Sequence, residues 1–291
     1  MKLMDYHTHH ERCGHALGTI EEVIKSAIEK NYLGEIGISD HFPIDALKIS
    51  PEFHKYLKIV SMSKVEFPNY IDEIKKLRQK YRDQIKVRIS TEIDFSTLNS
   101  LNTQKKTLEP FLDDLDYILG AVHNIKWSES PIIIITDPLS RSGSGSSPIK
   151  EFGSEKINLE YLEKMKKLVE TGFFDIIAHF DNQRFFFLPE EIEYSTTAWQ
   201  KLLDLLDIIK TKGMTVEINT SGKRKGVFRQ FPNDNIIKEM IQRNIPLTLG
   251  SDAHAPQYVG NGFLDFIDRA KKWGLSHLCF YEKREQKLIE I

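Results

Sequence analysis

Short runs of β-branched and apolar residues alternate with longer amphipathic stretches along nearly the whole chain. The short runs predict strands at Lys2–Tyr6, Glu35–Ser39, Lys86–Ser90, Tyr117–Val122, Phe174–Ala178, Thr215–Asn219, Pro246–Gly250 and His277–Tyr281. Strands that alternate with helices build a mainly parallel sheet, because each helix returns the chain to the starting edge of the next strand. The sequence therefore predicts an α/β protein whose sheet is either closed as a barrel or open and doubly wound.

The stretches between these strands have the features of amphipathic helices. Thr19 and Glu22 form the pattern of a capping box, and apolar residues follow at helical spacing. Further helices are expected at Asn158–Gly172, Ser195–Gly213, Asp234–Asn244 and Gly262–Gly274, three of which end at glycine, a frequent helix stop. No change in composition marks a domain boundary, so residues 1–291 are predicted to form one domain.

The alternation fails between residues 128 and 154. An apolar run at 132–135 precedes the segment SRSGSGSSP at 140–148, which is rich in serine and glycine. This composition is typical of a flexible surface insertion. A long loop in a compact domain is also often functional, so a lid over an active site is the alternative interpretation.

Charge and cysteine content exclude several classes of protein. The net charge of -2 lacks the basic excess that is usual in nucleic-acid-binding proteins. Two cysteines, Cys13 and Cys279, cannot build a disulfide framework. No segment approaches the ~18 apolar residues of a membrane helix. We therefore expect a cytoplasmic protein that acts on a small molecule, without a nucleic-acid or membrane partner.

Side chains that commonly bind metals follow the predicted strands at their carboxyl ends. Nine of them lie just past a strand end or in the loop after the first strand: His7, His9, His15, His41, Glu92, His123, His179, Asp252 and His254. The carboxyl ends of parallel strands share one edge of a sheet, where active sites are usually built. A single histidine at a strand end is more often a core or capping residue, but that explanation would have to apply separately at six strand ends.

The spacing of these residues indicates a metal site. Residues two apart on an extended segment point the same way, so His7 and His9 can bind one ion together, and Asp252 and His254 repeat this arrangement. Imidazole nitrogens with carboxylate oxygens suit Zn, Mn or Fe. Because nine candidate ligands are too many for one ion, we expect two or three divalent metal ions.

These residues resemble the motifs of the polymerase and histidinol phosphatase (PHP) family. The similarity covers His7-x-His9, Ser39-Asp40-His41, Glu92, His123, His179 and Asp252-x-His254. It implies a distorted barrel of seven β/α units with a trinuclear metal site at the C-terminal rim of the strands. By position, it implies a first ion held by His7, His9, Glu92 and Asp252, a second held by Glu92, His123 and His179, and a third held by His15, His41 and His254.

Within that family, the chain most resembles the enzymes that hydrolyse L-histidinol phosphate in histidine biosynthesis. The similar segments are residues 5–16, 179–184 and 217–226. The resemblance implies that Arg184 and Arg224 bind the substrate phosphate, and it leaves Lys223 and Lys225 as surface charges. Asp40 is the nearest candidate for a general acid, although a partner of a histidine ligand is at least as good an interpretation.

Two other functions remain open at this point. A phosphoesterase of the same family could act on nucleotides, DNA ends or another small phosphate ester. A non-catalytic metal-binding protein could also retain this fold, although the complete set of candidate ligands argues against it.

Overall fold

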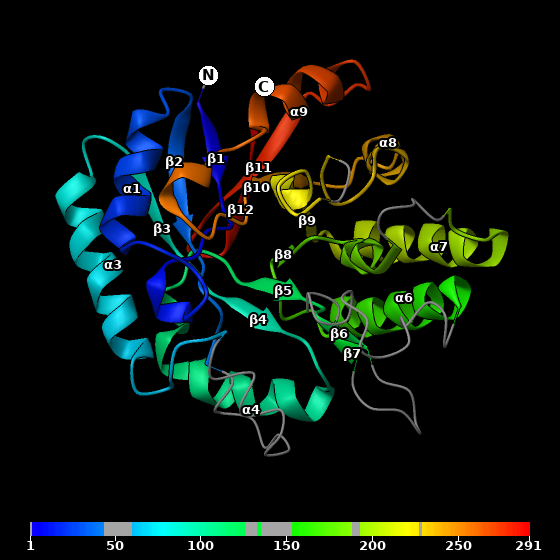
Figure 1. Ribbon diagram of the computed structural model, residues 1–291, viewed down its shortest axis with the longest axis horizontal. Coiled ribbons are helices and arrows are strands. Elements are labelled where there is room, and N and C mark those ends of the chain that lie inside the picture. Colours follow the sequence, from blue (N-terminus) through cyan, green and yellow to red (C-terminus); the bar gives the residue numbers. More distant parts are fainter. Residues whose placement is uncertain (1, 44–59, 126–132, 135–152, 188–192, 227–228) are drawn as a thin grey trace.

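The computed structural model describes residues 2–43, 60–125, 133–134, 153–187, 193–226 and 229–291. Strands lie at the centre of the molecule and helices surround them (Figure 1). One parallel sheet has the order β1-β2-β3, formed by Leu3–Asp5, Leu33–Ile38 and Lys86–Ile89. The second parallel sheet has the order β10-β9-β8-β5-β4, formed by Leu247–Gly250, Thr215–Asn219, Ile176–Ile177, Leu119–Ala121 and Glu92–Asp94.

The two parallel sheets are joined at both of their edges. Thr8 and Ala253 form a parallel bridge beyond the ends of β1 and β10, and His41 and Glu92 form another between the end of β2 and the start of β4. Only Ser90 and Thr91 separate β3 from β4, so one stretch of chain takes part in both sheets. The chain is thus an α/β protein with two joined parallel sheets, an arrangement that agrees with the fold implied by the family resemblance.

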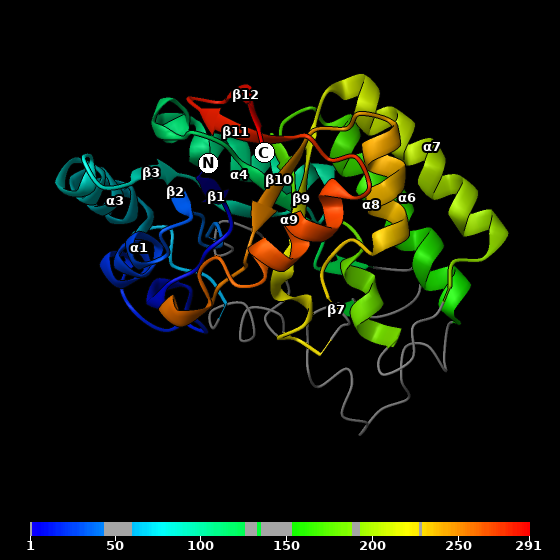
Figure 2. The same ribbon diagram turned by 90° about the horizontal axis from the view of Figure 1, so that it is seen from above.

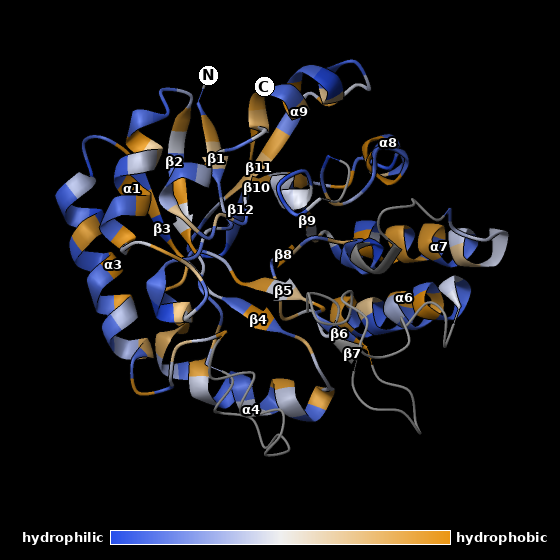
Figure 3. Cartoon of the chain, viewed as in Figure 1, coloured by the Kyte–Doolittle hydropathy of each residue, from blue (hydrophilic) through white to orange (hydrophobic). Residues whose placement is uncertain are grey.

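The helices place apolar faces against the strands and polar faces toward solvent (Figure 3). Helix α1 (Ile20–Glu29) begins with the predicted capping box, in which the Thr19 amide donates to Glu22 Oε2 at 2.7 Å and the Glu22 amide donates to Thr19 Oγ1 at 3.2 Å. Its buried residues follow helical spacing: Ile20, Val23, Ile24 and Ala27.

The other predicted helices are also present. They are α6 (Ser154–Glu170), α7 (Thr196–Lys212), α8 (Asp234–Gln242) and α9 (Phe263–Lys271). Helix α7 begins after the N-cap Ser195 and ends at Gly213, whose φ of 66° is the left-handed conformation that glycine adopts easily. The structure also contains two helices that the sequence analysis did not name: α3 (Phe67–Tyr81), which packs against β3, and α4 (Leu98–Leu108), which connects β4 to β5.

The predicted final strand forms but does not join the parallel sheets. Strand β11 (His277–Glu282) pairs antiparallel with β12 (Glu285–Glu290). This hairpin lies on the opposite side of the molecule from the turns that follow β9 and β10 (Figure 2). It packs beneath the strands, where the Tyr281 amide donates to the Tyr6 hydroxyl at 3.1 Å.

A cluster of buried and partly buried charges lies beside this hairpin, and we call it the hairpin-side cluster: Glu35, Arg88, Asp116, Asp175 and Arg284. Arg88 Nε donates to Glu35 Oε2 at 2.8 Å, and Arg284 Nε donates to Asp175 Oδ2 at 2.9 Å. The Arg284 amide also donates to the Asp116 carbonyl at 2.7 Å. These bonds fix the hairpin to the amino-terminal side of the sheets.

Two sequence predictions about the chain as a whole remain predictions. The described core residues form one continuous hydrophobic cluster. This cluster does not test the prediction that residues 1–291 form a single domain. Most of the predicted insertion at 128–154 lies outside the described residues, apart from β7 (Ile133–Ile134), which pairs antiparallel with β6 (Asn124–Ile125), and residues 153–154. Within the described part of the chain, no helix combines the length and apolar character needed to span a bilayer.

Candidate metal centre

The Glu92 carboxylate lies at the centre of the predicted ligands. Five histidines approach it at nitrogen–oxygen distances of 2.9–3.5 Å: His7, His9, His41, His123 and His179. Because Glu92 is only 1% exposed, bulk water cannot take the place of the imidazoles around its carboxylate. A buried carboxylate that faces imidazoles on both of its oxygens is suited to bridge two cations.

The remaining predicted ligands extend this cluster. Asp252 Oδ1 lies 3.5 Å from His9 Nε2 and 3.2 Å from His254 Nδ1. His254 Nε2 in turn lies 2.8 Å from His15 Nε2. All nine predicted ligands therefore meet in one continuous cluster at the carboxyl ends of the strands.

Among the nine predicted ligands, three sets of ligand atoms are close enough together to share an ion. They are His7, His9 and Asp252; His7, Glu92 and His179; and His9, His41 and His254. Because the sets share residues, the cluster has donors for more than one cation.

Hydrogen bonds to one ring nitrogen orient several imidazoles for metal binding. His7 Nδ1 lies 2.8 Å from Glu217 Oε1, His15 Nδ1 lies 2.9 Å from the Cys13 carbonyl, and His254 Nδ1 lies 3.0 Å from the Asp252 carbonyl. Each of these oxygens accepts, so each Nδ1 donates and Nε2 is the nitrogen that is directed into the cluster for a cation. The rings are thus held in the orientation that a cation requires.

The surroundings of His9 and His15 favour the neutral form of both imidazoles. Burial, followed by the neighbouring His254 and His41, holds the pKa of His9 well below its usual value. Burial and the same two neighbours lower the pKa of His15 to about 3. Neutral imidazole is the form that binds metals, so these two residues need no deprotonation at neutral pH.

The inner groups carry the charge. Burial alone would raise the pKa of Glu92, but the imidazoles of His41 and His7 outweigh it and hold that pKa well below its usual value. For His7, burial acts to lower the pKa, but the Glu217 and Glu92 carboxylates raise it well above its usual value. A cation that binds His7 Nε2 would therefore displace a proton.

The backbone is strained at two of the predicted ligands. His179 and Asp252 have φ angles of 28° and 49°, in the left-handed region that residues with side chains seldom adopt. Such conformations are retained where the surrounding structure needs the side chain in one direction, and they concentrate at functional sites.

Glu217 is a supporting residue of the site, and the sequence analysis assigned it no role. Its Oε1 binds His7 Nδ1, and its Oε2 accepts the His179 amide at 2.7 Å. Gly250 makes room for this carboxylate, because a Cβ at that position would lie 1.8 Å from Glu217 Oε1. In the sequence, Glu217 is one more acidic residue near a strand end. Nothing there marks it as the partner of a histidine ligand.

A second supporting network lies behind His123. The Asp94 carboxylate accepts the His123 amide at 3.0 Å and lies 3.4 Å from His123 Nδ1. Asn124 Nδ2 donates to Asp94 at 2.8 Å, and Lys164 Nζ on α6 donates to the Asn124 carbonyl at 2.6 Å. Burial lowers the pKa of Lys164 to about 8.

The loop after β9 brings two cations to the cluster, which corrects one prediction. Lys225 was interpreted as a surface charge, but its ammonium group contacts the Asp252 carboxylate. Arg224 Nη2 donates to the Asp252 carbonyl at 2.6 Å, and its guanidinium lies 4.7 Å from the centre of the Tyr258 ring. The loop therefore turns both side chains toward the metal centre. The sequence predicts otherwise for Lys225, because a run of three basic residues is typical of charges exposed to solvent.

Arg184 lies deeper in the protein than Arg224. It is 5% exposed, and its Nη1 donates to Asp181 Oδ2 at 3.0 Å and to the Gln230 carbonyl at 3.2 Å. Through Gln230 it fixes the end of the loop that carries Arg224.

The Asp40 carboxylate is directed to His10, and it also lies within 4.8 Å of ligand atoms of His9 and Cys13. Its carboxylate accepts the His10 amide at 2.9 Å and contacts His10 Nδ1. Asp40 is fully buried, so this geometry favours a positioning role over that of a general acid. Cys13 lies in the same set as Asp40 and His9, but burial raises the pKa of the Cys13 thiol, which disfavours the thiolate needed for metal binding.

The cluster fits divalent cations on the chemistry of its donors. Carboxylates and unprotonated imidazoles converge, and the buried Glu92 Oε2 has no hydrogen-bond partner within the described residues although three imidazole nitrogens surround it. A cation between these atoms would satisfy them together.

Comparisons with known proteins agree with this geometry. The model of the PHP domain matches residues 5–221, and that of the PHP-associated region matches residues 231–273. A "Probable histidinol-phosphatase" of Deinococcus radiodurans is 28% identical over 98% of both chains, and the histidinol-phosphatase of Bacillus subtilis is 26% identical over 92% of this chain and 100% of its own. The structure is similar to that of a Lactococcus lactis histidinol phosphate phosphatase complexed with Zn, L-histidinol and phosphate, with a TM-score of 0.75, 18% identity, and coverage of 98% and 99% of the two chains.

Proposed function

Because this chain belongs to the PHP domain family, we propose that it is a metal-dependent phosphomonoesterase that hydrolyses L-histidinol phosphate to L-histidinol and phosphate. The observation that carries the proposal is the Glu92 carboxylate surrounded by five imidazoles, with Arg224 at the edge of the same cluster. The choice of substrate is supported by relatives named histidinol-phosphatase that match this chain over nearly its full length.

We propose three sets of metal ligands, the first two of which share Glu92. They are His7, His9, Glu92 and Asp252; Glu92, His123 and His179; and His15, His41 and His254. Bound divalent ions supply a water of lowered pKa and stabilise charge on the attacking and leaving oxygens of a phosphate ester. Zn is the identity favoured by the Zn-containing Lactococcus lactis structure, while Mn and Fe suit the same donors.

The residues behind the ligands keep this site in one geometry. Glu217 holds the His7 ring and the His179 backbone, and Asp94 holds His123. Such partners fix the ring orientation and increase the basicity of the ligating nitrogen. The ligands therefore need little rearrangement when the ions bind.

The phosphate group needs cationic hydrogen-bond donors beside the ions. Arg224 is partly buried at the edge of the cluster, and its planar guanidinium can bind two phosphate oxygens at once. Arg184 is a proposed second phosphate contact, and its bond to the Gln230 carbonyl also holds the loop that carries Arg224. Asp40 is proposed to position His10 and the backbone next to His9, and not to transfer the proton.

One set of measurements tests the function. The purified protein is analysed for bound metals, and phosphate release is compared between L-histidinol phosphate and a panel of nucleotides and sugar phosphates. We expect bound divalent metal and turnover of L-histidinol phosphate well above the panel. A preference for a nucleotide would refute the proposed substrate, and a metal-loaded protein without hydrolysis of any ester would refute the enzymatic function.

A further inference from the structure

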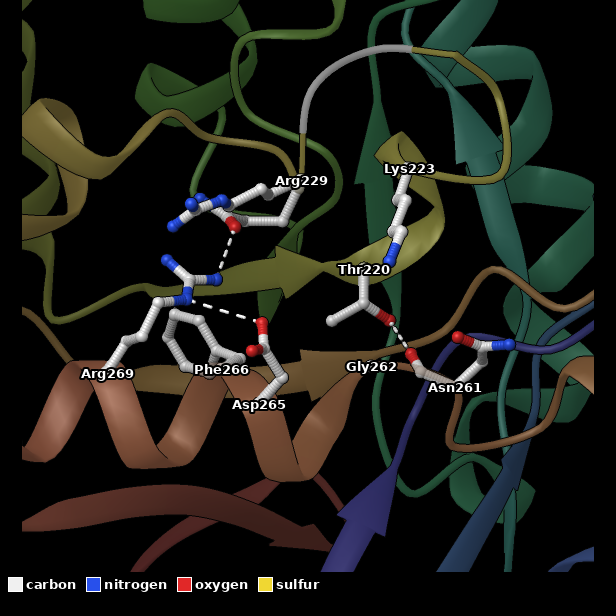
Figure 4. A pocket seen from close by; sticks show the side chains of 9 residues that line it. Thr220, Lys223, Arg229, Asn261, Gly262, Asp265, Phe266 and Arg269 are labelled. Atoms are coloured by element: carbon white, nitrogen blue, oxygen red, sulfur yellow. Dashed lines mark hydrogen bonds and ion pairs between the residues drawn. The ribbon is translucent and has the colours of Figure 1, made fainter.

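A cavity of about 540 Å³ lies beside the metal centre, between the turn and loop after β9 and helix α9 (Figure 4). A volume of this size is in the range of small-molecule sites. Thr220 and Asn261 connect the two sides of the cavity, because the Thr220 hydroxyl donates to the Asn261 carbonyl at 2.6 Å. The lining residues that the following argument uses are Lys223, Arg229, Asp265 and Arg269.

One of the three cations in this lining is compensated. Arg269 Nε lies 3.4 Å from Asp265 Oδ2, and its Nη1 donates to Asp234 Oδ1 at 3.0 Å. Its Nη2 also donates to Gln230 Oε1 at 2.9 Å. Figure 4 shows the contact between Arg269 and Asp265 on helix α9.

The other two cations, Lys223 and Arg229, are not compensated. Both are exposed, and neither has an ion-pair partner within the described ranges of the chain. The cavity therefore carries an excess of about two positive charges, since the carboxylate of Asp265 is used by Arg269.

The backbone places Lys223 and Arg229 next to each other in this loop, and their side chains extend to different parts of the cavity (Figure 4). Asn219 and Phe231 pair as an antiparallel bridge, and within the loop that they close the Lys223 amide donates to the Arg229 carbonyl at 3.2 Å. The uncapped start of α9 at Gly262 lines the same cavity and adds a weakly positive helix end.

The loop separates this cavity from the metal centre. Arg224 and Lys225 contact Asp252 on one side, whereas Lys223 lines the cavity on the other. The cationic lining also does not suit the ammonium group of L-histidinol phosphate, because like charges repel. The cavity is therefore poorly suited to the organic part of the proposed substrate.

We propose that this cavity is a second anion site that binds a phosphate group, either free or on a small organic molecule. A phosphate dianion matches the two uncompensated charges, and Arg229 can bind it through two parallel bonds while Lys223 supplies a point charge. The site is distinct from the metal centre and does not depend on which ester the metal centre hydrolyses.

Equilibrium dialysis of the metal-loaded protein against radiolabelled inorganic phosphate tests this proposal. The unmodified chain is expected to bind two phosphates, one at the metal centre and one in the cavity. Lys223→Gln/Arg229→Gln should weaken the second phosphate at least about tenfold, since two charge-assisted hydrogen bonds are lost. Metal content and kcat/KM measured at low phosphate should remain unchanged in this variant.

Two further variants serve as controls. Lys223→Arg/Arg229→Lys keeps both charges and should retain the second phosphate. Lys212→Gln/Lys272→Gln removes two charges elsewhere on the surface and should also retain it. A single bound phosphate in the unmodified chain, or two in Lys223→Gln/Arg229→Gln, would overturn the proposal. A chain that binds two phosphates but fails to hydrolyse L-histidinol phosphate would contradict the proposed function and leave this site intact.

Discussion

The metal centre and the hairpin-side cluster both concentrate buried charged groups, but on opposite sides of the strands. In the hairpin-side cluster the protein supplies both partners, as in Arg88 with Glu35 at 2.8 Å and Arg284 with Asp175 at 2.9 Å. In the metal centre, one carboxylate meets five imidazoles that are themselves crowded together. Buried charge that is paired internally supports the fold, whereas convergent lone pairs indicate an external cation.

The largest effect is expected from removing the bridging carboxylate of the metal centre. Glu92→Gln keeps the size of the side chain but removes the charge between the imidazoles, so kcat should fall on the order of 10³-fold with a loss of bound metal. Elemental analysis and phosphate release measure the two effects. The exposed Glu170→Gln should change neither, and full activity in Glu92→Gln would remove the contrast between the two clusters.

A substitution in the hairpin-side cluster should change the free energy of unfolding and not the catalytic activity. Arg88→Met leaves the buried Glu35 without its guanidinium partner, so the free energy of unfolding should fall by about 3 kcal/mol. Denaturant unfolding measures this change, and Arg82→Met at an exposed position is the control. If Arg88→Met instead lost metal while its stability stayed the same, the two clusters would not be independent.

Arg224 tests whether a cation beside the metal centre acts on the substrate. Arg224→Ala should raise KM between about 10- and 100-fold, the range expected for a lost hydrogen bond to a charged group. Metal content should not change, because Arg224 binds carbonyl oxygens and not ligand side chains. Lys223→Ala, one residue away on the other side of the loop, should leave KM unchanged; lost metal in Arg224→Ala would mean that its role is structural.

The last prediction concerns Lys164, a cation buried behind the metal centre. Its pKa in the folded protein is about 8, below the value of 10.5 in an unfolded chain. Between these values the unfolded state binds more protons, so stability rises with pH by up to about 1.4 kcal/mol per pH unit. The full destabilising contribution is present below pH 8. Unfolding of wild type and Lys164→Met from pH 7 to 10.5 should show this slope only in the wild type, and equal slopes would contradict it.

The candidate ligands were predictable because strand ends are visible in the sequence. Each histidine of the set follows a short apolar run, and parallel strands bring such positions to one edge. Helix limits such as Ser195 and Gly213 were also readable, since capping chemistry is local.

The remaining features depend on contacts between distant residues. Glu217 is one acid among many until β9 places it against His7, and Lys225 is one of three basic residues until the loop turns it to Asp252. The partner of β11 was equally hidden, because an alternating apolar pattern defines a strand but not the strand beside it.

The parallel bridges between the two sheets have a further consequence for the metal-free protein. His7, His9 and His41 come from the chain segments of the first sheet, while Glu92 and Asp252 come from those of the second. Ions shared by these residues would cross-link the seams at Thr8–Ala253 and His41–Glu92, so metal affinity and the joining of the two sheets would be thermodynamically linked. Amide hydrogens along both seams should then exchange faster after chelation, while those of the β11–β12 hairpin keep their protection.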